Sequence, residues 1–451
     1  MDQLPREILA EVLEFLVGPA PTEYRLHDQP SDGLLESEVL DLKSASQVSH
    51  LWRGQALPIL FRHVQWRPEL SSLDGLDPVP LLRFLVGNRL QRNVITFTLL
   101  VDFADHQIES ARVAYQIRPS DLEWLWDQLF AAIDPLRFTI IAPPATLAAF
   151  LNRMLFLDDA WSFNIPYHIL SLARSHRGPR RDSENMLDLL SSPFGTSSSP
   201  PGASSSVAGS FKGAVPAPPC PFLTLRPWTS ILLNEGSSIR AYQTYEFFLR
   251  SPPSMLSALL GTGEYPNNSP LFPRTVVDFN YIAIFPLSSH ISHLIHHLPK
   301  LDRFFVRFTP RPNNCILEDR QTLKHVDVAD LWMERTTAFR HMLGEIVNDP
   351  GGGGGGSGSG SENWKTLNVF EIGEMEDAEV RTLAHTYVDR AGSGWIVTDG
   401  VASGAMVRVD EEGKAKGPSG AVVPHTLAVR HDVLHGPGWA VMPNYHFQPV
   451  L

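Results

Sequence analysis

Apolar and polar positions follow two patterns along most of the chain, and each pattern predicts a different kind of secondary structure. Short, continuous apolar runs predict buried strands, whereas apolar residues that recur every three or four positions predict amphipathic helices. Strands are expected at 94–101, 136–141, 276–285, 303–308 and 367–372. Helices are expected at 80–90, 120–133, 145–157, 288–298, 326–346 and 377–388. This alternation favours parallel pairing and an α/β fold.

The strand–helix units are irregularly spaced. The consensus Leu-x-x-Leu-x-Leu-x-x-Asn, which marks regular leucine-rich repeats, does not occur in the sequence. Over residues 67–390 we therefore expect an irregular, leucine-rich-repeat-like arc of strands and helices that serves as a substrate-binding domain. A compact, doubly wound sheet is the alternative arrangement of the same elements.

Two segments interrupt the globular pattern. Residues 191–221 are dominated by Ser, Pro and Gly, and residues 351–361 consist of Gly and Ser, so both are expected to be disordered loops. Beyond residue 390 the pattern changes to short strands, at 395–398 and 405–409. Residues 391–451 are therefore expected to form a β-rich C-terminal element.

The first residues of the chain predict an amphipathic helix. Its apolar positions recur at helical spacing and are Leu4, Ile8, Leu9, Val12, Leu13 and Leu16. Pro5 suits the first turn of such a helix, where a missing N–H is tolerated. A second stretch has the same spacing, with apolar residues Leu42, Ala45, Val48, Leu51 and Trp52. The run at 56–64 then leads into a first strand.

Two motifs in these helices, Leu-Pro-Arg-Glu-Ile-Leu at 4–9 and Val-Ser-His-Leu-Trp-Arg at 48–53, together resemble an F-box. The continuation Leu-Phe-Arg-His-Val at 60–64 is similar to that of fungal F-box proteins. The resemblance covers about residues 1–66. It departs from the family pattern at about 17–40, an acidic, proline-containing insertion that we expect to be a surface loop. The alternative is an ordinary helical hairpin that begins a larger fold.

The resemblance implies a substrate-recognition subunit of an SCF-type ubiquitin ligase. The F-box helices would bind a Skp-type adaptor, which links to a cullin, while the α/β domain would bind an unknown target protein. Proximity would drive ubiquitin transfer, so the chain would be no enzyme and would need no cofactor or metal. By motif match, the adaptor-binding residues would be Leu4, Pro5, Ile8, Leu9, Val12, Leu13, Leu42, Val48 and Trp52. A non-ligase adaptor complex and an α/β enzyme with an unrecognised site are the alternatives.

Composition argues against several classes of protein. A net charge of −12 over 451 residues is unlike a nucleic-acid-binding surface, which needs a dense basic stripe. Cys220 and Cys315 are too far apart for a zinc-binding spacing or a disulfide framework. No secretory signal opens the chain, and Pro143 and Pro144 break the best membrane-spanning candidate, 138–157. We therefore expect a cytoplasmic or nuclear protein that does not bind membranes.

Side chains with catalytic or metal-binding potential are few. His290, His293 and His297 share one face of an expected helix and could bind a metal, but no carboxylate or cysteine lies near them in the sequence. Residues 400–404 have the wrong order for a Gly-x-Ser-x-Gly motif. Ser403 is therefore interpreted as a turn residue and not as a nucleophile.

Trp124 and Trp126 stand two positions apart on the expected helix at 120–133. Side chains two positions apart on a helix point in different directions, so both cannot enter the same core. One of the two indoles is therefore expected at a rim or an interface.

Overall fold

A computed structural model of the chain shows a mixed α/β fold built on a ten-stranded, mostly parallel sheet. The structure describes residues 5–35, 39–68, 76–101, 117–155, 166–177, 219–312, 314–347, 362–391, 394–398, 404–409 and 415. The loops expected at 191–221 and 351–361 lie outside these ranges, apart from residues 219–221. Most of the expected C-terminal element also lies outside them.

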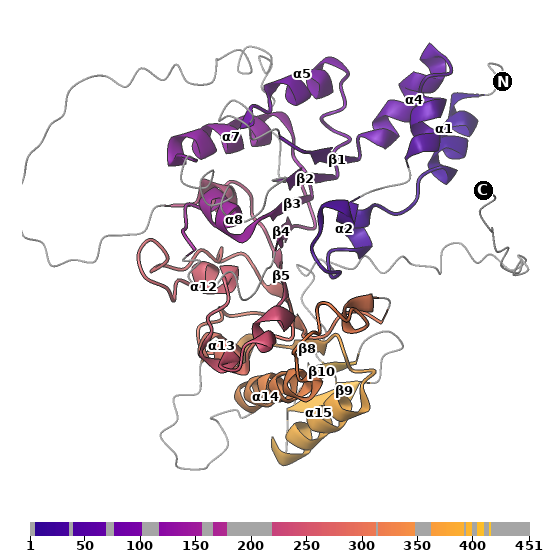
Figure 1. Cartoon of the computed structure of the whole chain (residues 1–451). Coiled ribbons are helices and arrows are strands. Elements are labelled where there is room, and N and C mark those ends of the chain that lie inside the picture. Colours follow the sequence, from indigo (N-terminus) through magenta and orange to yellow (C-terminus); the bar gives the residue numbers. More distant parts are fainter. Residues whose placement is uncertain are drawn as a thin grey trace, which may run out of the picture.

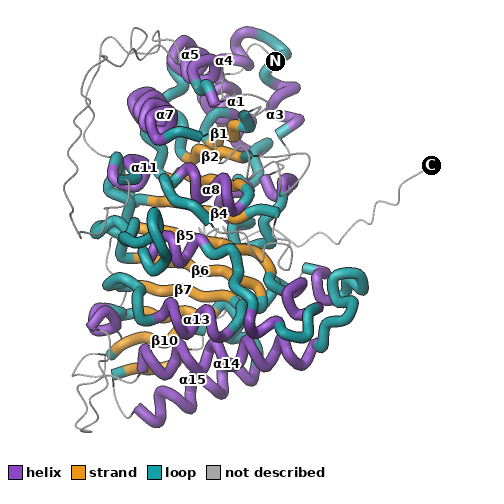
Figure 2. Tube along the Cα trace, turned by 60° about the vertical axis from the view of Figure 1, so that its left-hand side comes forward, coloured by secondary structure: helices purple, strands orange, loops and turns teal. Residues whose placement is uncertain are grey.

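The strands cross the sheet in nearly the order of the sequence. They are β1 (His63–Trp66), β2 (Thr96–Leu100), β3 (Arg137–Ala142), β4 (His168–Ala173), β5 (Ser230–Ser237), β6 (Asp278–Ile284), β7 (Arg303–Arg307), β8 (Val369–Ile372), β9 (Trp395–Thr398) and β10 (Ala405–Arg408). Neighbours in the sequence are neighbours in the sheet from β1 to β8, as Figure 2 shows for β4 to β7. After β8, β10 lies between β8 and β9 (Figure 1). A doubly wound sheet would reverse its order partway, so that alternative is wrong.

Most strand pairs are parallel. The exceptions are the two pairs that β4 makes, with β3 and β5, and the two pairs that β10 makes, with β8 and β9. The sheet continues across both domain boundaries expected from the sequence, because β1 precedes residue 67 and the hairpin of β9 and β10 follows residue 390.

The helices of the described residues lie mainly on one face of the sheet. They are α1 (Arg6–Phe15), α2 (Pro21–Tyr24), α3 (Leu40–Ala45), α4 (His50–Leu60), α5 (Val79–Gly87), α7 (Pro119–Ala132), α8 (Pro144–Phe150), α11 (Pro221–Thr224), α12 (Met255–Leu260), α13 (Ser288–Ile295), α14 (Val328–Val347) and α15 (Ala378–Ala391). Short 3-10 helices are η1 (Asp32–Leu35), η3 (Ile239–Gln243), η4 (Phe247–Leu249), η5 (Cys315–Leu317) and η6 (Glu362–Thr366). Figure 1 shows α7, α8 and α12 on one side of the strands and α2 on the other. Within the described ranges, no helix combines the length and apolarity needed to cross a bilayer.

The amphipathic stretch expected to contain Leu42 to Trp52 is two helices, because α3 ends at Ala45 and Ser49 is the N-cap of α4. The elements expected after residue 66 are present, with bounds that differ by at most about three residues in all but one case. The exception is the helix expected to reach residue 157, because α8 ends at Phe150 and Asn152 follows with a left-handed φ of 53°. Strands β4 and β5, which flank the Ser-, Pro- and Gly-rich stretch, were not expected.

The sheet face beneath the helices is apolar. Side chains in register on successive strands form a row that crosses the whole sheet. The row consists of Val64, Phe97, Phe138, Leu172, Ile231, Phe279, Phe304, Phe370, Met406 and Val397. Helices packed on strands bury such a face completely, so this row and the helix residues opposite it form the main core.

The opposite face carries buried polar side chains on neighbouring strands. Arg303 on β7 donates to Asp278 on β6 across 2.8 Å, and to both carboxylate oxygens of Glu371 on β8 across 2.9 and 2.6 Å. Ser230 on β5 donates to Asp278 across 2.5 Å. Burial alone would lower the pKa of Arg303, but hydrogen bonds and charges from Glu371 and Asp278 raise that pKa overall. We call these four residues the buried charge network.

Residues 20–34, within the expected insertion at 17–40, run across this polar face as a segment that we call the strap. The prediction of a surface loop is wrong for the strap, because Leu26 and Leu34 are buried. They belong to a second core cluster whose sheet members are Leu100, Ile141, Ile169, Leu232, Ile282 and Phe305. Figure 1 shows α2, which lies in the strap, on the side of the sheet away from α8 and α12.

Candidate protein-binding surface

Three N-terminal helices, α1, α3 and α4, pack together beside the first strands and form what we call the helical module (Figure 1). Ser49 begins α4 as an N-cap residue, since its hydroxyl accepts a 3.3 Å hydrogen bond from the Trp52 amide. Arg62, which follows α4, donates to Glu14 on α1 across 2.7 Å. The core of the module consists of Leu9, Leu13, Leu42, Ala45, Ala56 and Ile59.

Three residues expected at the adaptor interface lie in this core instead. Leu9, Leu13 and Leu42 are at most 1% exposed. They hold the helices together and offer no surface to a partner, so the expectation is corrected for these three side chains. The sequence showed only that α1 has apolar residues on two sides, and the packing of α4 decided which side turns inward. Leu4, also expected at the interface, lies outside the described residues.

Other apolar side chains of α1 point away from the module core. Pro5, Ile8, Val12 and Phe15 are spaced by three, four and three positions, which places them on one side of the helix, and we call them the α1 stripe. Ile8 and Val12 are 44% and 43% exposed, and Phe15 is 84% exposed. Burying an apolar side chain is worth roughly 1.5–3 kcal/mol, so a contiguous exposed set of this kind marks a surface for a partner.

Apolar side chains are also exposed on α3 and on the turn that follows it. Val48 is 64% exposed, and Leu40 at the start of α3 is 73% exposed. Trp52 is half-buried against the module core, and its buried indole N–H has no hydrogen-bond partner. Two exposed apolar residues of the module, Phe15 and Leu40, were not among those expected at the interface. The spacing from Val12 could have identified Phe15, whereas no periodicity distinguished Leu40.

Trp52→Ala should destabilise the module without unfolding the sheet. Truncating a core tryptophan costs about 3–5 kcal/mol, and we expect about 2 kcal/mol here because Trp52 is only partly buried. That cost corresponds to roughly thirtyfold faster amide hydrogen exchange in α1, with no change in the strands of the sheet. Arg53→Ala, on the exposed neighbouring residue, is the matched control. Unchanged exchange in α1 of the Trp52 variant would show that the indole does not support the module.

A cleft of about 1010 Å³ lies between the module and the first two strands. Its walls include apolar residues from the ends of α1 and α4, such as Leu16 and Phe61. On the strand side, His63 Nδ1 lies 3.0 Å from Thr96 Oγ1, and burial lowers the pKa of His63, so its imidazole is neutral near pH 7. Phe15 belongs to both the cleft and the α1 stripe. A partner on the stripe would therefore lie against one wall of the cleft.

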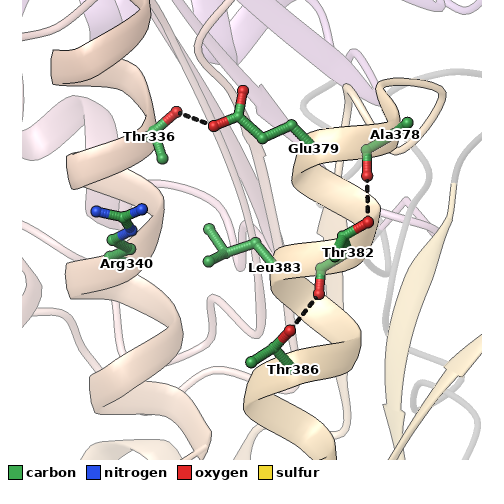
Figure 3. Close-up of a pocket in the computed structure, with 7 residues that line it drawn as sticks. All are labelled: Thr336, Arg340, Ala378, Glu379, Thr382, Leu383 and Thr386. Atoms are coloured by element: carbon green, nitrogen blue, oxygen red, sulfur yellow. Dashed lines mark hydrogen bonds between the residues drawn. The ribbon is translucent and has the colours of Figure 1, made fainter.

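A smaller cavity, of about 390 Å³, lies between α14 and α15 (Figure 3). The Thr382 and Thr386 hydroxyls donate to backbone carbonyls one turn earlier on α15, across 2.7 Å in both cases. Thr336 on α14 donates to Glu379 on α15 across 3.1 Å. Glu379 also accepts a hydrogen bond from the buried Arg335. The two contacts of Glu379 join the helices, and all three hydroxyl protons are already donated within the protein.

The histidines of α13 differ in their surroundings. His290 is turned inward, and burial lowers its pKa to about 4. His297 Nδ1 lies 3.1 Å from the carbonyl oxygen of His293, within the same helix. No group of three or more His, Cys, Asp or Glu side chains suited to a metal ion occurs in the described part of the chain.

The surface with the clearest chemistry is thus the α1 stripe. It is apolar, while its immediate neighbours Glu7 and Glu11 are polar and exposed, which is the composition of a protein-binding site with a charged rim. No protein-family model matches this chain, and neither does any curated protein or solved structure.

Proposed function

We propose that this protein is a substrate-recognition subunit of an SCF-type ubiquitin ligase and that its α1 stripe binds a Skp-type adaptor. The observation that carries the proposal is the exposed stripe on a helical module whose own core is complete without it. The F-box resemblance of 4–9 and 48–53 supports the same assignment, because Pro5, Ile8 and Val48 from these motifs lie on the surface.

The sheet supports the second half of the proposal, which is that the rest of the chain holds a target protein. Strands that follow in chain order from β1 to β8, with helices on one face, suit an irregular leucine-rich-repeat-like arc. Such an arc is a rigid platform. Ubiquitin transfer would then be accelerated by proximity between the held target and a conjugating enzyme, and no residue of this chain would react.

Replacing two residues of the α1 stripe by aspartate, Ile8→Asp with Val12→Asp, should abolish adaptor binding. Each apolar side chain contributes roughly 1.5–3 kcal/mol when a partner buries it, and each new carboxylate would have to be desolvated. We therefore expect at least about a hundredfold weaker binding in a titration with purified Skp-type adaptor. Because both positions are exposed, the thermal unfolding midpoint should stay within about 2 °C of the wild-type value.

Leu249→Asp is the matched control, since Leu249 on η4 is also exposed but lies outside the module. This variant should bind the adaptor like the wild type. Co-purification from cell extract then separates the classes of complex: adaptor with cullin supports the ligase, and adaptor without cullin indicates a non-ligase complex. Unchanged adaptor binding by the Ile8 and Val12 variant, or no binding by the wild type, would contradict the proposal.

A further inference from the structure

The sheet holds the strap through its backbone. Side chains of the sheet and of the loop after β7 donate to four strap carbonyl oxygens, at alternate residues. Arg137 on β3 donates to the carbonyl of residue 22 across 2.7 Å, and Arg311 donates to that of residue 24 across 2.9 Å. Asn234 on β5 donates to those of residues 26 and 28 across 3.0 and 2.7 Å. Hydrogen bonds to main-chain oxygens can form whatever side chains the bound segment carries.

The side chains of the strap add two apolar anchors and an ion pair with the sheet side. Leu26 and Leu34 both enter the second core cluster. Asp28 lies 3.1 Å from the Arg311 guanidinium. A backbone held by fixed donors, with buried apolar residues and a paired acid, is how a protein surface recognises a short peptide. Here the peptide is part of the same chain.

One strap residue, His27, places a polar ring where it is buried and incompletely hydrogen-bonded. His27 is buried with its ring 4.8 Å from that of Phe305, and its Nε2 has no hydrogen-bond partner. Burial holds the pKa of His27 well below its usual range, and four nearby guanidinium groups lower it further. These belong to Arg311, Arg307, Arg303 and Arg137.

Several carboxylates act on those arginines, and two of them belong to the strap. Asp278 and Glu371 pair with Arg303, and the charges of Glu374 and Glu376 act on Arg307. The strap supplies Asp28, which pairs with Arg311, and Glu23, whose charge acts on Arg137. A segment that displaced the strap would have to replace these two carboxylates. An additional acidic side chain at the position of His27 would lie near the four guanidinium groups.

We propose that the polar face of the sheet is a peptide-binding site that the strap occupies in cis, and that its partner is an acidic segment of another protein that displaces the strap. This deepens the proposed function, because it names where a target would bind and what chemistry it would present. The strap then competes with the target segment for the same site, and it occupies the site until a segment that binds more tightly displaces it.

The test uses the full-length chain and no adaptor, so its outcome is separate from that of the adaptor titration. Leu26→Asp should loosen the strap by removing one of its two buried leucines and placing a carboxylate in the apolar cluster. The probes are two fluorescent peptides, one with the sequence of residues 20–31 and one with His27→Glu. We expect the parent peptide to bind the Leu26 variant at least tenfold more tightly than the wild type. The His27→Glu peptide should bind at least another tenfold more tightly.

Adding Asn234→Ala to the Leu26 variant should weaken both peptides at least tenfold. Asn152→Ala is the matched control, because the Asn152 amide also holds a backbone carbonyl, that of Pro219, but away from this face. Loss of binding with Asn234→Ala and not with Asn152→Ala supports the site. A folded Leu26 variant that binds neither peptide, or a His27→Glu peptide no tighter than its parent, overturns the proposal.

If Leu26→Asp prevents folding, hydrogen exchange on the wild-type chain decides the question. Saturating His27→Glu peptide should accelerate exchange of the strap amides and leave α14 unchanged. Unaltered strap exchange would show that the segment is a fixed part of the fold, and would overturn the proposal.

Discussion

Replacing Arg303 by methionine should lower the free energy of unfolding by about 3–5 kcal/mol. The side chain of Asp278 is fully buried, and the change leaves its carboxylate with only the hydrogen bonds from Ser230 and Asn280. A charge left without its counter-ion in the interior costs far more than the pair contributed. Urea unfolding followed by circular dichroism would measure the loss as a lower transition midpoint with an unchanged slope.

Two further variants test the reason for this effect. Adding Asp278→Asn should recover most of the lost stability, because the amide keeps its polar contacts but carries no charge. Arg62→Met breaks the ion pair with Glu14, in which both side chains are about one-third or more exposed, so it should cost no more than about 1 kcal/mol. Equal costs for the Arg303 and Arg62 variants would mean that water reaches the buried charge network.

Trp126→Ala should lower the free energy of unfolding by about 3–5 kcal/mol. The indole is fully buried, and its ring centroid lies 4.7 Å from that of Phe222, 5.8 Å from that of Phe138 and 6.0 Å from that of Phe150. Removing it leaves a cavity that links α7 to β3, α8 and α11, and these rigid neighbours cannot collapse to fill it. Thermal or urea unfolding of the whole chain measures the loss.

Trp124→Ala on the same helix is the matched control. Trp124 is only partly buried at the edge of the same core, so its truncation should cost less than half as much. Similar losses for the two variants would contradict the assignment of Trp126 to the centre and Trp124 to the rim. The sequence predicted that the two indoles point in different directions, but it did not indicate which one enters the core.

The strap shows where sequence reasoning was misled. Its acids and prolines are typical of surface loops, and its two leucines are too few to signal a core element. The two leucines are buried because they pack in one cluster with sheet residues from strands as distant in the sequence as β2 and β7. Likewise, the backbone oxygens of the strap are satisfied by Asn234, more than two hundred positions away. No local pattern carries information about such partners.

The sequence by itself determined most strands and helices between residues 67 and 390, with β4 and β5 among the exceptions. It also determined the amphipathic character of α1 and the short strands of the C-terminal hairpin. These properties follow from apolar periodicity, which acts over a few residues. The tertiary structure alone decided the antiparallel course of β4, the burial of Leu9, Leu13 and Leu42, and the α1 stripe. It also decided the closure of the polar face by the strap. Each of these depends on which surface another element covers, and burial against a distant segment is worth more than the local preferences that a sequence displays.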